Sequence, residues 1–175
     1  MVELFTTTEC VHAKPLNSME QALRRYYKRP SARMSQKTVA KLIRAGVDPK
    51  AARIDLELVK LQLQSDLNWS AKRCEVAELE YKRLLTLHLW NRNLSHPLVP
   101  TALVDNIWHK HILDTRAYHA DMESLFGEYL HHFPFLGFRS EPSKRLKMKA
   151  FRLTCKLYQQ TFGEPFTESA KKLST

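Results

Sequence analysis

Glycine and cysteine are scarce in this chain, and each shortage excludes a class of structure. Four glycines among 175 residues exclude collagen-like and glycine-rich arrays. The three cysteines, Cys10, Cys74 and Cys155, form no Cys-x-x-Cys pair, so neither a disulfide framework nor a cysteine-only zinc site is expected. No apolar run reaches the roughly 18 residues that a membrane span needs. We therefore expect a cytoplasmic protein, in a reducing compartment, with no membrane partner.

Positive charge is what the chain has in excess. Lysine and arginine number 28 against 18 aspartates and glutamates, a net charge of +10 that attracts phosphate, nucleic acid or an acidic protein. The excess is concentrated between residues 24 and 44, where no acidic residue occurs. The basic residues of this stretch are Arg24, Arg25, Lys28, Arg29, Arg33, Lys37, Lys41 and Arg44. Nucleic-acid binding through this basic face is one functional prediction, and an acidic protein partner is its alternative.

Apolar residues make up 43% of the chain, which is enough for one hydrophobic core. They recur at helical spacing, whereas alternating strand patterns are missing, so the sequence predicts an all-α fold, a single helical domain of about six helices over residues 1–175. Three sections follow one another in it: basic N-terminal helices (1–93), a signature region (94–165) and a loosely held tail (166–175).

Capping residues, prolines and glycines predict where the helices begin and end. Ser35, Ser70 and Thr101 are expected to cap helices, whereas Gly127 and Gly163 are expected to terminate them. Prolines at 97 and 100 make the segment 94–100 a loop. The helices expected from these signals cover residues 17–27, 35–46, 48–67, 70–91, 101–126 and 142–163.

Five of the eight histidines lie between residues 109 and 132, which makes this segment the candidate site. In a continuous helix, His111 and Thr115 fall within an apolar stripe with Trp108, so both would need polar partners. Asp105 and His109 lie one turn apart on the opposite face. At about 100° per residue, His109 and His111 point about 160° apart, so one ion cannot bind both.

Two alternative metal sites follow from this helical geometry. In one, Asp105 and His109 act together, with His119 as a third member; in the other, His111 is joined by His131 or His132 after the turn at Gly127. Zinc or iron would be the cofactor. Because only neutral imidazole ligates, metal affinity would decline below about pH 6.5. The simpler interpretation is that these histidines are hydrogen-bonded residues of the core.

A set of short motifs gives the segment a resemblance to a known family. These motifs are Pro-Leu-Val-Pro (97–100), Trp108-His109-x-His111, Leu125-Phe126-Gly127 and His131-His132-Phe133-Pro134. Together they resemble the glycine-rich-domain-containing-protein-like family, a domain of unknown function in plant multidomain proteins and small bacterial proteins. The resemblance implies a helical module without an established reaction. The signature positions that it implies are Asp105, Trp108, His109, His111, Thr115 and Tyr118.

The function predicted first is a non-catalytic module that binds a partner protein or a small ligand. The signature helix and the His131-His132 segment would form the binding surface. The alternatives are a metal-dependent site, which includes a metalloenzyme, and nucleic-acid binding through the basic face. An enzyme is not favoured, because no serine, cysteine or lysine nucleophile can be assigned. The predicted binding residues are Asp105, Trp108, His109, His111, Thr115, Tyr118, His131 and His132.

Overall fold

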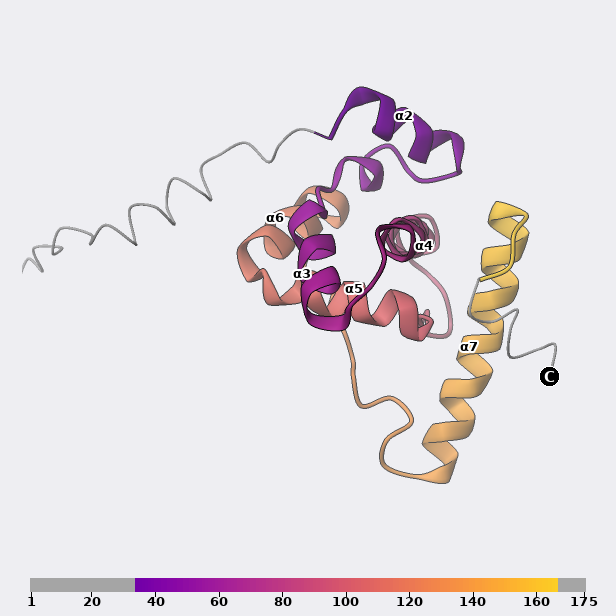
Figure 1. Cartoon of the computed structure of the whole chain (residues 1–175). Coiled ribbons are helices and arrows are strands. Elements are labelled where there is room, and N and C mark those ends of the chain that lie inside the picture. Colours follow the sequence, from indigo (N-terminus) through magenta and orange to yellow (C-terminus); the bar gives the residue numbers. More distant parts are fainter. Residues whose placement is uncertain (1–33, 167–175) are drawn as a thin grey trace, which may run out of the picture. The chain divides into compact units, whose positions relative to one another are not determined.

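The structure, a computed structural model, describes residues 34–166, which form helices joined by connections of different lengths (Figure 1). No strand occurs among these residues, which confirms the all-α prediction for them, and none of their helices is long and apolar enough to span a membrane. The expected helix at 17–27 lies outside the described residues. The elements are α2 (Gln36–Arg44), the 3-10 helix η1 (Ala51–Arg53), α3 (Glu57–Leu67), α4 (Ala71–Trp90), α5 (Ala102–Leu113), α6 (Thr115–Phe126) and α7 (Glu141–Phe162).

Hydroxyl side chains begin several of these helices where the sequence predicts. Ser35, Ser70 and Thr101 each accept a hydrogen bond from the backbone N–H three residues later, which pairs one of the free donors of the first turn. Gly127 and Gly163 end α6 and α7 in the left-handed region, at φ 72° and 71°. A side chain would be strained at either position, which is why glycine marks these ends.

The predicted helix over 48–67 is wrong, because a non-helical break at residues 54–56 separates η1 from α3. Aspartate side chains pair with the local backbone in place of a helical ladder. Asp48 Oδ1 accepts from Lys50 N at 2.8 Å, and Asp55 Oδ1 accepts from Glu57 N at 3.0 Å. The break turns the chain, so that α3 packs against both α4 and α5.

The predicted helix over 101–126 is also two helices, since α5 ends at Leu113 and α6 begins at Thr115. Asp114 lies between them, and its side chain accepts from Ala117 N at 3.3 Å as the cap of α6. Helical spacing therefore predicts which residues share a face only within α5 or within α6, and not across the two helices. Thr115 illustrates the error, because it is exposed at the start of α6 and does not lie in a buried stripe.

Helix α4 lies at the centre of the described fold and is seen end-on in Figure 1. It contacts η1, α3, α5 and α7, and most of its length is buried, including charged residues. Lys82 is fully buried, and its Nζ atom lies 2.8 Å from Glu78 Oε1. The other carboxylate oxygen, Glu78 Oε2, lies 2.8 Å from Lys60 Nζ. Burial acts to raise the pKa of Glu78, but these two lysines outweigh it and hold the pKa below its usual value.

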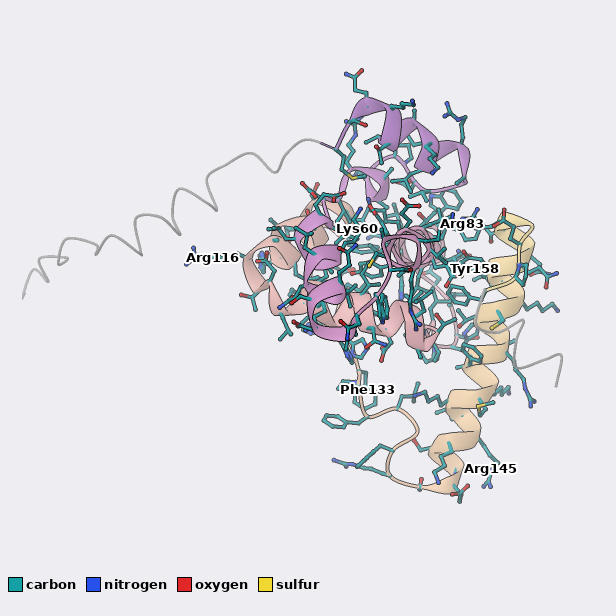
Figure 2. All side chains as sticks on the ribbon, viewed as in Figure 1. Lys60, Arg83, Arg116, Phe133, Arg145 and Tyr158 are labelled. Atoms are coloured by element: carbon teal, nitrogen blue, oxygen red, sulfur yellow. The ribbon has the colours of Figure 1, made fainter. Side chains whose placement is uncertain are left out.

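Arg83 joins α4 to both ends of the described chain. Its guanidinium donates to Ala45 O at 2.9 Å, to Tyr158 Oη at 3.2 Å and to Glu164 Oε2 at 2.9 Å. Figure 2 shows Arg83 and Tyr158 facing each other between α4 and α7. The Tyr158 ring stacks on Phe166 with centroids 4.1 Å apart. Phe166, the first residue of the expected tail, is therefore fully buried.

Replacing Glu78 with Gln tests the buried charge network. The substitution leaves the Lys82 ammonium buried without a carboxylate, so we expect the free energy of unfolding at pH 7 to fall by about 3 kcal/mol in urea denaturation. Because the pKa of Glu78 is lowered in the folded state, the wild type keeps this stabilisation above about pH 4.5 and loses it as the pH falls through the folded pKa. In the Glu78→Gln variant, the free energy of unfolding should not show this loss as the pH falls.

The exposed Glu75, on the same helix, provides the matched control. Glu75→Gln should change the free energy of unfolding by less than about 0.5 kcal/mol. If both variants lose the same free energy of unfolding, the buried network of Lys60, Glu78 and Lys82 does not stabilise the fold more than an exposed glutamate does.

Candidate functional site

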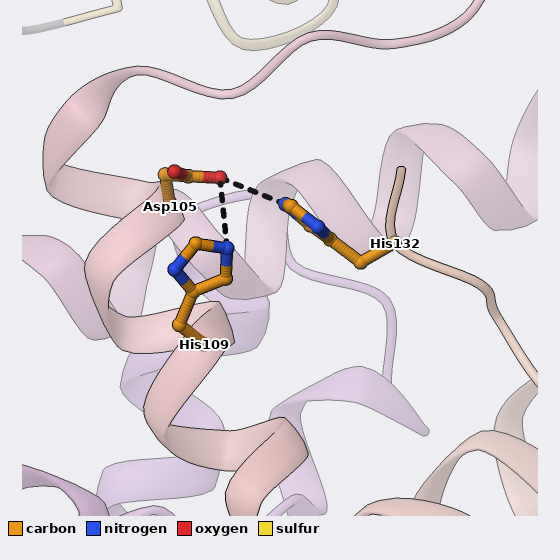
Figure 3. Close-up of side chains that lie close together, drawn as sticks. All are labelled: Asp105, His109 and His132. Atoms are coloured by element: carbon orange, nitrogen blue, oxygen red, sulfur yellow. Dashed lines mark hydrogen bonds and ion pairs between the residues drawn. The ribbon is translucent and has the colours of Figure 1, made fainter. Parts of the chain in front are cut away.

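Asp105, His109 and His132 converge on one point of the surface (Figure 3). Asp105 and His109 lie one turn apart on α5, whereas His132 lies in the irregular segment after α6. His132 Nε2 is 2.9 Å from Asp105 Oδ1, and His109 Nε2 is 3.8 Å from the same oxygen. His132 is largely buried, with 12% of its side chain exposed, whereas 38% of Asp105 and 48% of His109 is exposed. One carboxylate oxygen and two imidazole nitrogens thus lie within 4.8 Å of one another.

Tyr118 holds the segment that carries His132. Its hydroxyl donates to Leu130 O at 2.6 Å and accepts from Trp108 Nε1 at 3.0 Å, which connects α6 to the segment and to α5. Burial raises the pKa of Tyr118 to about 12, so the hydroxyl keeps its proton at neutral pH. The Trp108 ring then lies edge-on to His132, with centroids 4.7 Å apart. The Trp108 side of this contact is fixed by its hydrogen bond to Tyr118.

His111 lies in a separate, buried environment with both nitrogens paired. Nε2 is 3.1 Å from Asp121 Oδ2, and Nδ1 is 3.1 Å from Tyr81 Oη. Because a carboxylate only accepts, Nε2 is the donor to Asp121, and in the tautomer that carries its proton on Nε2, Nδ1 accepts a hydrogen bond from the Tyr81 hydroxyl group. His111 is therefore buried and partnered, as the apolar stripe predicts, but its partners are not His131 or His132. The structure places His132 beside His109 instead.

The remaining predicted site residues do not join either group. His131 is exposed, with its ring 4.8 Å from that of Tyr129. His119 is also exposed, on α6, with its ring 6.1 Å from the same tyrosine, so it is not the third member of the Asp105 and His109 pair. Thr115 lies exposed at the first residue of α6. The third member is His132, which follows His109 by 23 residues and so shares no helical spacing with it.

A cavity of about 460 Å³ adjoins the Asp105, His109 and His132 cluster. Its walls come from α4, the connection at 97–101, α5, the segment at 131–136 and the middle of α7. Apolar side chains supply most of the lining, with Trp108 buried on the inside and Phe133 and Met148 exposed at the rim. Figure 2 shows Phe133 on the segment between α6 and α7. The volume lies within the range of small-molecule sites, and the cluster forms the polar part of the wall.

Sequence reasoning missed His88, Tyr81 and Asp121. His88, in the last turn of α4, lines the cavity, and its Nε2 is shielded from solvent with no hydrogen-bond partner in the described part of the chain. Burial lowers its pKa to about 4, so the ring is neutral at pH 7. Its position on an apolar helical stripe was an available signal, the same one that marks His111. Tyr81 lies on the same stripe, seven residues before His88, but neither it nor Asp121 signals a partnership with His111, which only tertiary packing creates.

A family model matches residues 53–164, and the chain belongs to that family, UCP032817-like, which is uncharacterised. The match includes α3 to α7 and every residue of the cluster. The predicted membership of a glycine-rich-domain family is wrong, because the model that matches is a different one and nothing indicates the glycine-rich family. No curated protein and no solved structure matches the chain.

Tyr118→Phe tests whether the two hydrogen bonds of the Tyr118 hydroxyl group hold the segment that carries His132 in place. Removing the hydroxyl leaves the Trp108 N–H buried without an acceptor and frees the Leu130 carbonyl, so we expect the free energy of unfolding to fall by about 1–3 kcal/mol in urea denaturation. The NMR signals of the His132 ring should shift or broaden as well. Tyr129→Phe is the control, because Tyr129 packs against Tyr118 but is 37% exposed. If both variants behave alike, the two hydrogen bonds do not fix this segment.

Proposed function

We propose that this member of the UCP032817-like family binds a divalent transition-metal ion, zinc or iron, with Asp105, His109 and His132, and exposes it to a small ligand in the adjoining cavity. The observation that carries the proposal is the convergence of two imidazole nitrogens and a carboxylate oxygen from separate parts of the chain. Two nitrogens and one oxygen form a donor set that suits both metals.

The distances within the cluster suit a common ion after a small movement. Two atoms that each lie about 2.1 Å from one ion are separated by roughly 3.0–3.4 Å at octahedral or tetrahedral angles. His132 Nε2 and Asp105 Oδ1, 2.9 Å apart, are already close to this separation. His109 Nε2, at 3.8 Å from Asp105 and within 4.8 Å of the imidazole nitrogen of His132, would have to approach both by roughly 1 Å. Its half-exposed side chain has room for that rotation.

Three protein ligands leave coordination positions for water and for a further molecule, whereas structural zinc sites are closed by four protein ligands. An open position facing a cavity supports ligand binding at the metal. The cavity also supports the sequence-based prediction of a small-ligand module, because the signature helix and the 131–134 segment both line it. A protein partner for the same surface stays a prediction.

Metal content tests the proposal directly. We expect protein purified without a histidine tag to take up about one zinc or ferrous ion per chain, measured by elemental analysis and by calorimetric titration, the iron under anaerobic conditions. His109→Ala and His132→Ala should each weaken binding by at least about tenfold, since each removes one of three ligands.

His119→Ala is the matched control, because His119 is an exposed histidine of the same region outside the cluster. Its metal affinity should equal that of the wild type. Circular dichroism must show that every variant keeps its helices. A folded wild type that binds neither ion, or equal affinity in all variants, would remove the proposal.

A second candidate function is nucleic-acid binding through the basic face, and α2 offers a specific observation in its favour. Lys37, Lys41 and Arg44 are exposed on α2, which contains no acidic residue. Their spacing of four and three residues puts them on one side of the helix. The other five residues of the predicted face, Arg24, Arg25, Lys28, Arg29 and Arg33, lie outside the described residues.

A mobility-shift assay with duplex DNA over roughly 50–200 mM salt tests this second candidate. Wild-type affinity should fall steeply as salt rises, and Lys41→Ala should reduce the slope of log K against log salt by about one if Lys41 contacts a phosphate. Lys72→Ala, an exposed lysine on α4, should leave the slope unchanged. Binding that does not respond to salt would contradict a phosphate interface.

A further inference from the structure

The metal proposal leaves one polar group of the cavity unexplained, the imidazole of His88. Its Nε2 atom is shielded from solvent and has no hydrogen-bond partner in the described part of the chain, whereas other atoms of the residue line the cavity, so a ligand reaches Nε2 only when the ring turns towards it. Buried polar atoms in folded proteins are nearly always paired, because an unpaired one has lost its bonds to water without replacement. A partner that comes from outside the chain would explain this atom.

We infer that the cavity binds a small, uncharged alcohol or phenol whose hydroxyl group forms a hydrogen bond with His88 Nε2 and whose apolar ring packs against Trp108. The inference rests on the proposed function only in using the same cavity as the ligand site. It requires no metal ion, so the two proposals are tested separately.

The state of His88 selects an uncharged hydroxyl group. The ring is neutral at pH 7, because burial lowers its pKa to about 4, and it therefore offers no charge to balance an anion in a desolvated position. Depending on its tautomer, Nε2 either donates or accepts one hydrogen bond. A hydroxyl group can pair with both tautomers, since it donates and accepts, whereas a carbonyl group can only accept.

The surroundings of His88 select an apolar body for the ligand. Trp108 lies edge-on to His88 with centroids 6.1 Å apart, and Leu98, Val99 and Phe151 contribute further apolar lining. The acidic and basic lining residues other than the histidines, Asp105 and Lys147, are more exposed than Trp108, so they lie in the outer part of the cavity. A volume of about 460 Å³ is sufficient for a substituted aromatic ring.

Trp108 also fixes how far His88 lies from the cluster. The Trp108 centroid is 6.1 Å from His88 and 4.7 Å from His132, so the two imidazoles are separated by at most about 11 Å. A ring-sized molecule that is hydrogen-bonded to His88 and packed on Trp108 would therefore lie close to the Asp105, His109 and His132 group.

Paired probes that differ by one hydroxyl group test the inference, namely 4-ethylphenol and ethylbenzene. Both are titrated into the full chain in buffer with EDTA, and binding is followed by NMR of the histidine rings and the Trp108 indole. We expect the wild type to bind 4-ethylphenol about tenfold more tightly than ethylbenzene, because only the phenol pairs with the buried nitrogen. The phenol should also shift the His88 Nε2 resonance.

His88→Leu should remove the preference, so that both probes bind with similar affinity, and His88→Gln, which keeps a polar group, should restore part of it. His119→Leu, a change at an exposed histidine, should keep the full preference. Equal affinity of the wild type for the two probes would overturn the inference. A preference that persists in a folded His88→Leu would overturn it too.

Metal titration of His88→Leu separates this result from the proposed function. His88 is outside the cluster, so zinc affinity should match that of the wild type. Loss of the hydroxyl preference with normal zinc binding is the expected pattern. A chain that binds no zinc but prefers the phenol would support the inference and remove the metal proposal.

Discussion

The hydroxyl group of Tyr118 donates a hydrogen bond to the Leu130 carbonyl and accepts one from the Trp108 indole, and these two bonds fix the segment that carries His132 against α5. Residues 131–136 contain no helix, so their own backbone does not determine where His132 lies. The buried tyrosine supplies that constraint, and Trp108 transmits it to the His132 ring through an edge-on contact. The convergence with Asp105 depends on this arrangement.

Helix α4 gives His88 and His111 different environments. Tyr81, on α4, hydrogen-bonds with His111, whose other nitrogen pairs with Asp121, so this imidazole is saturated within the protein. His88, two turns further along α4, lines the cavity and has an unpaired nitrogen in the described part of the chain. The saturated histidine stabilises the packing of α4 on α5 and α6. Because, of these two described residues, only His88 has an unpaired ring nitrogen, it is His88, rather than His111, that would form a hydrogen bond with a ligand.

Local signals in the sequence predicted the beginnings and ends of helices well and their continuity less well. Ser70 and Thr101 cap helices because the interaction spans only three residues, which any reader of the sequence can see. The breaks near Asp55 and at Asp114 were missed, because an aspartate inside a periodic pattern either stays helical or caps a new helix, and packing decides between these outcomes. Thr115 was misplaced for the same reason.

The sequence by itself determined that the described chain is helical, that His109 and His111 face different environments, and that Asp105 accompanies His109. Each of these follows from the fixed geometry of one helical turn. Only the tertiary structure decided that His132 completes the Asp105 and His109 group, that Asp121 and Tyr81 satisfy His111, and that His88 lines a cavity. Those contacts join residues 10 to 30 positions apart through a turn or between helices, where no repeat in the sequence specifies the distance.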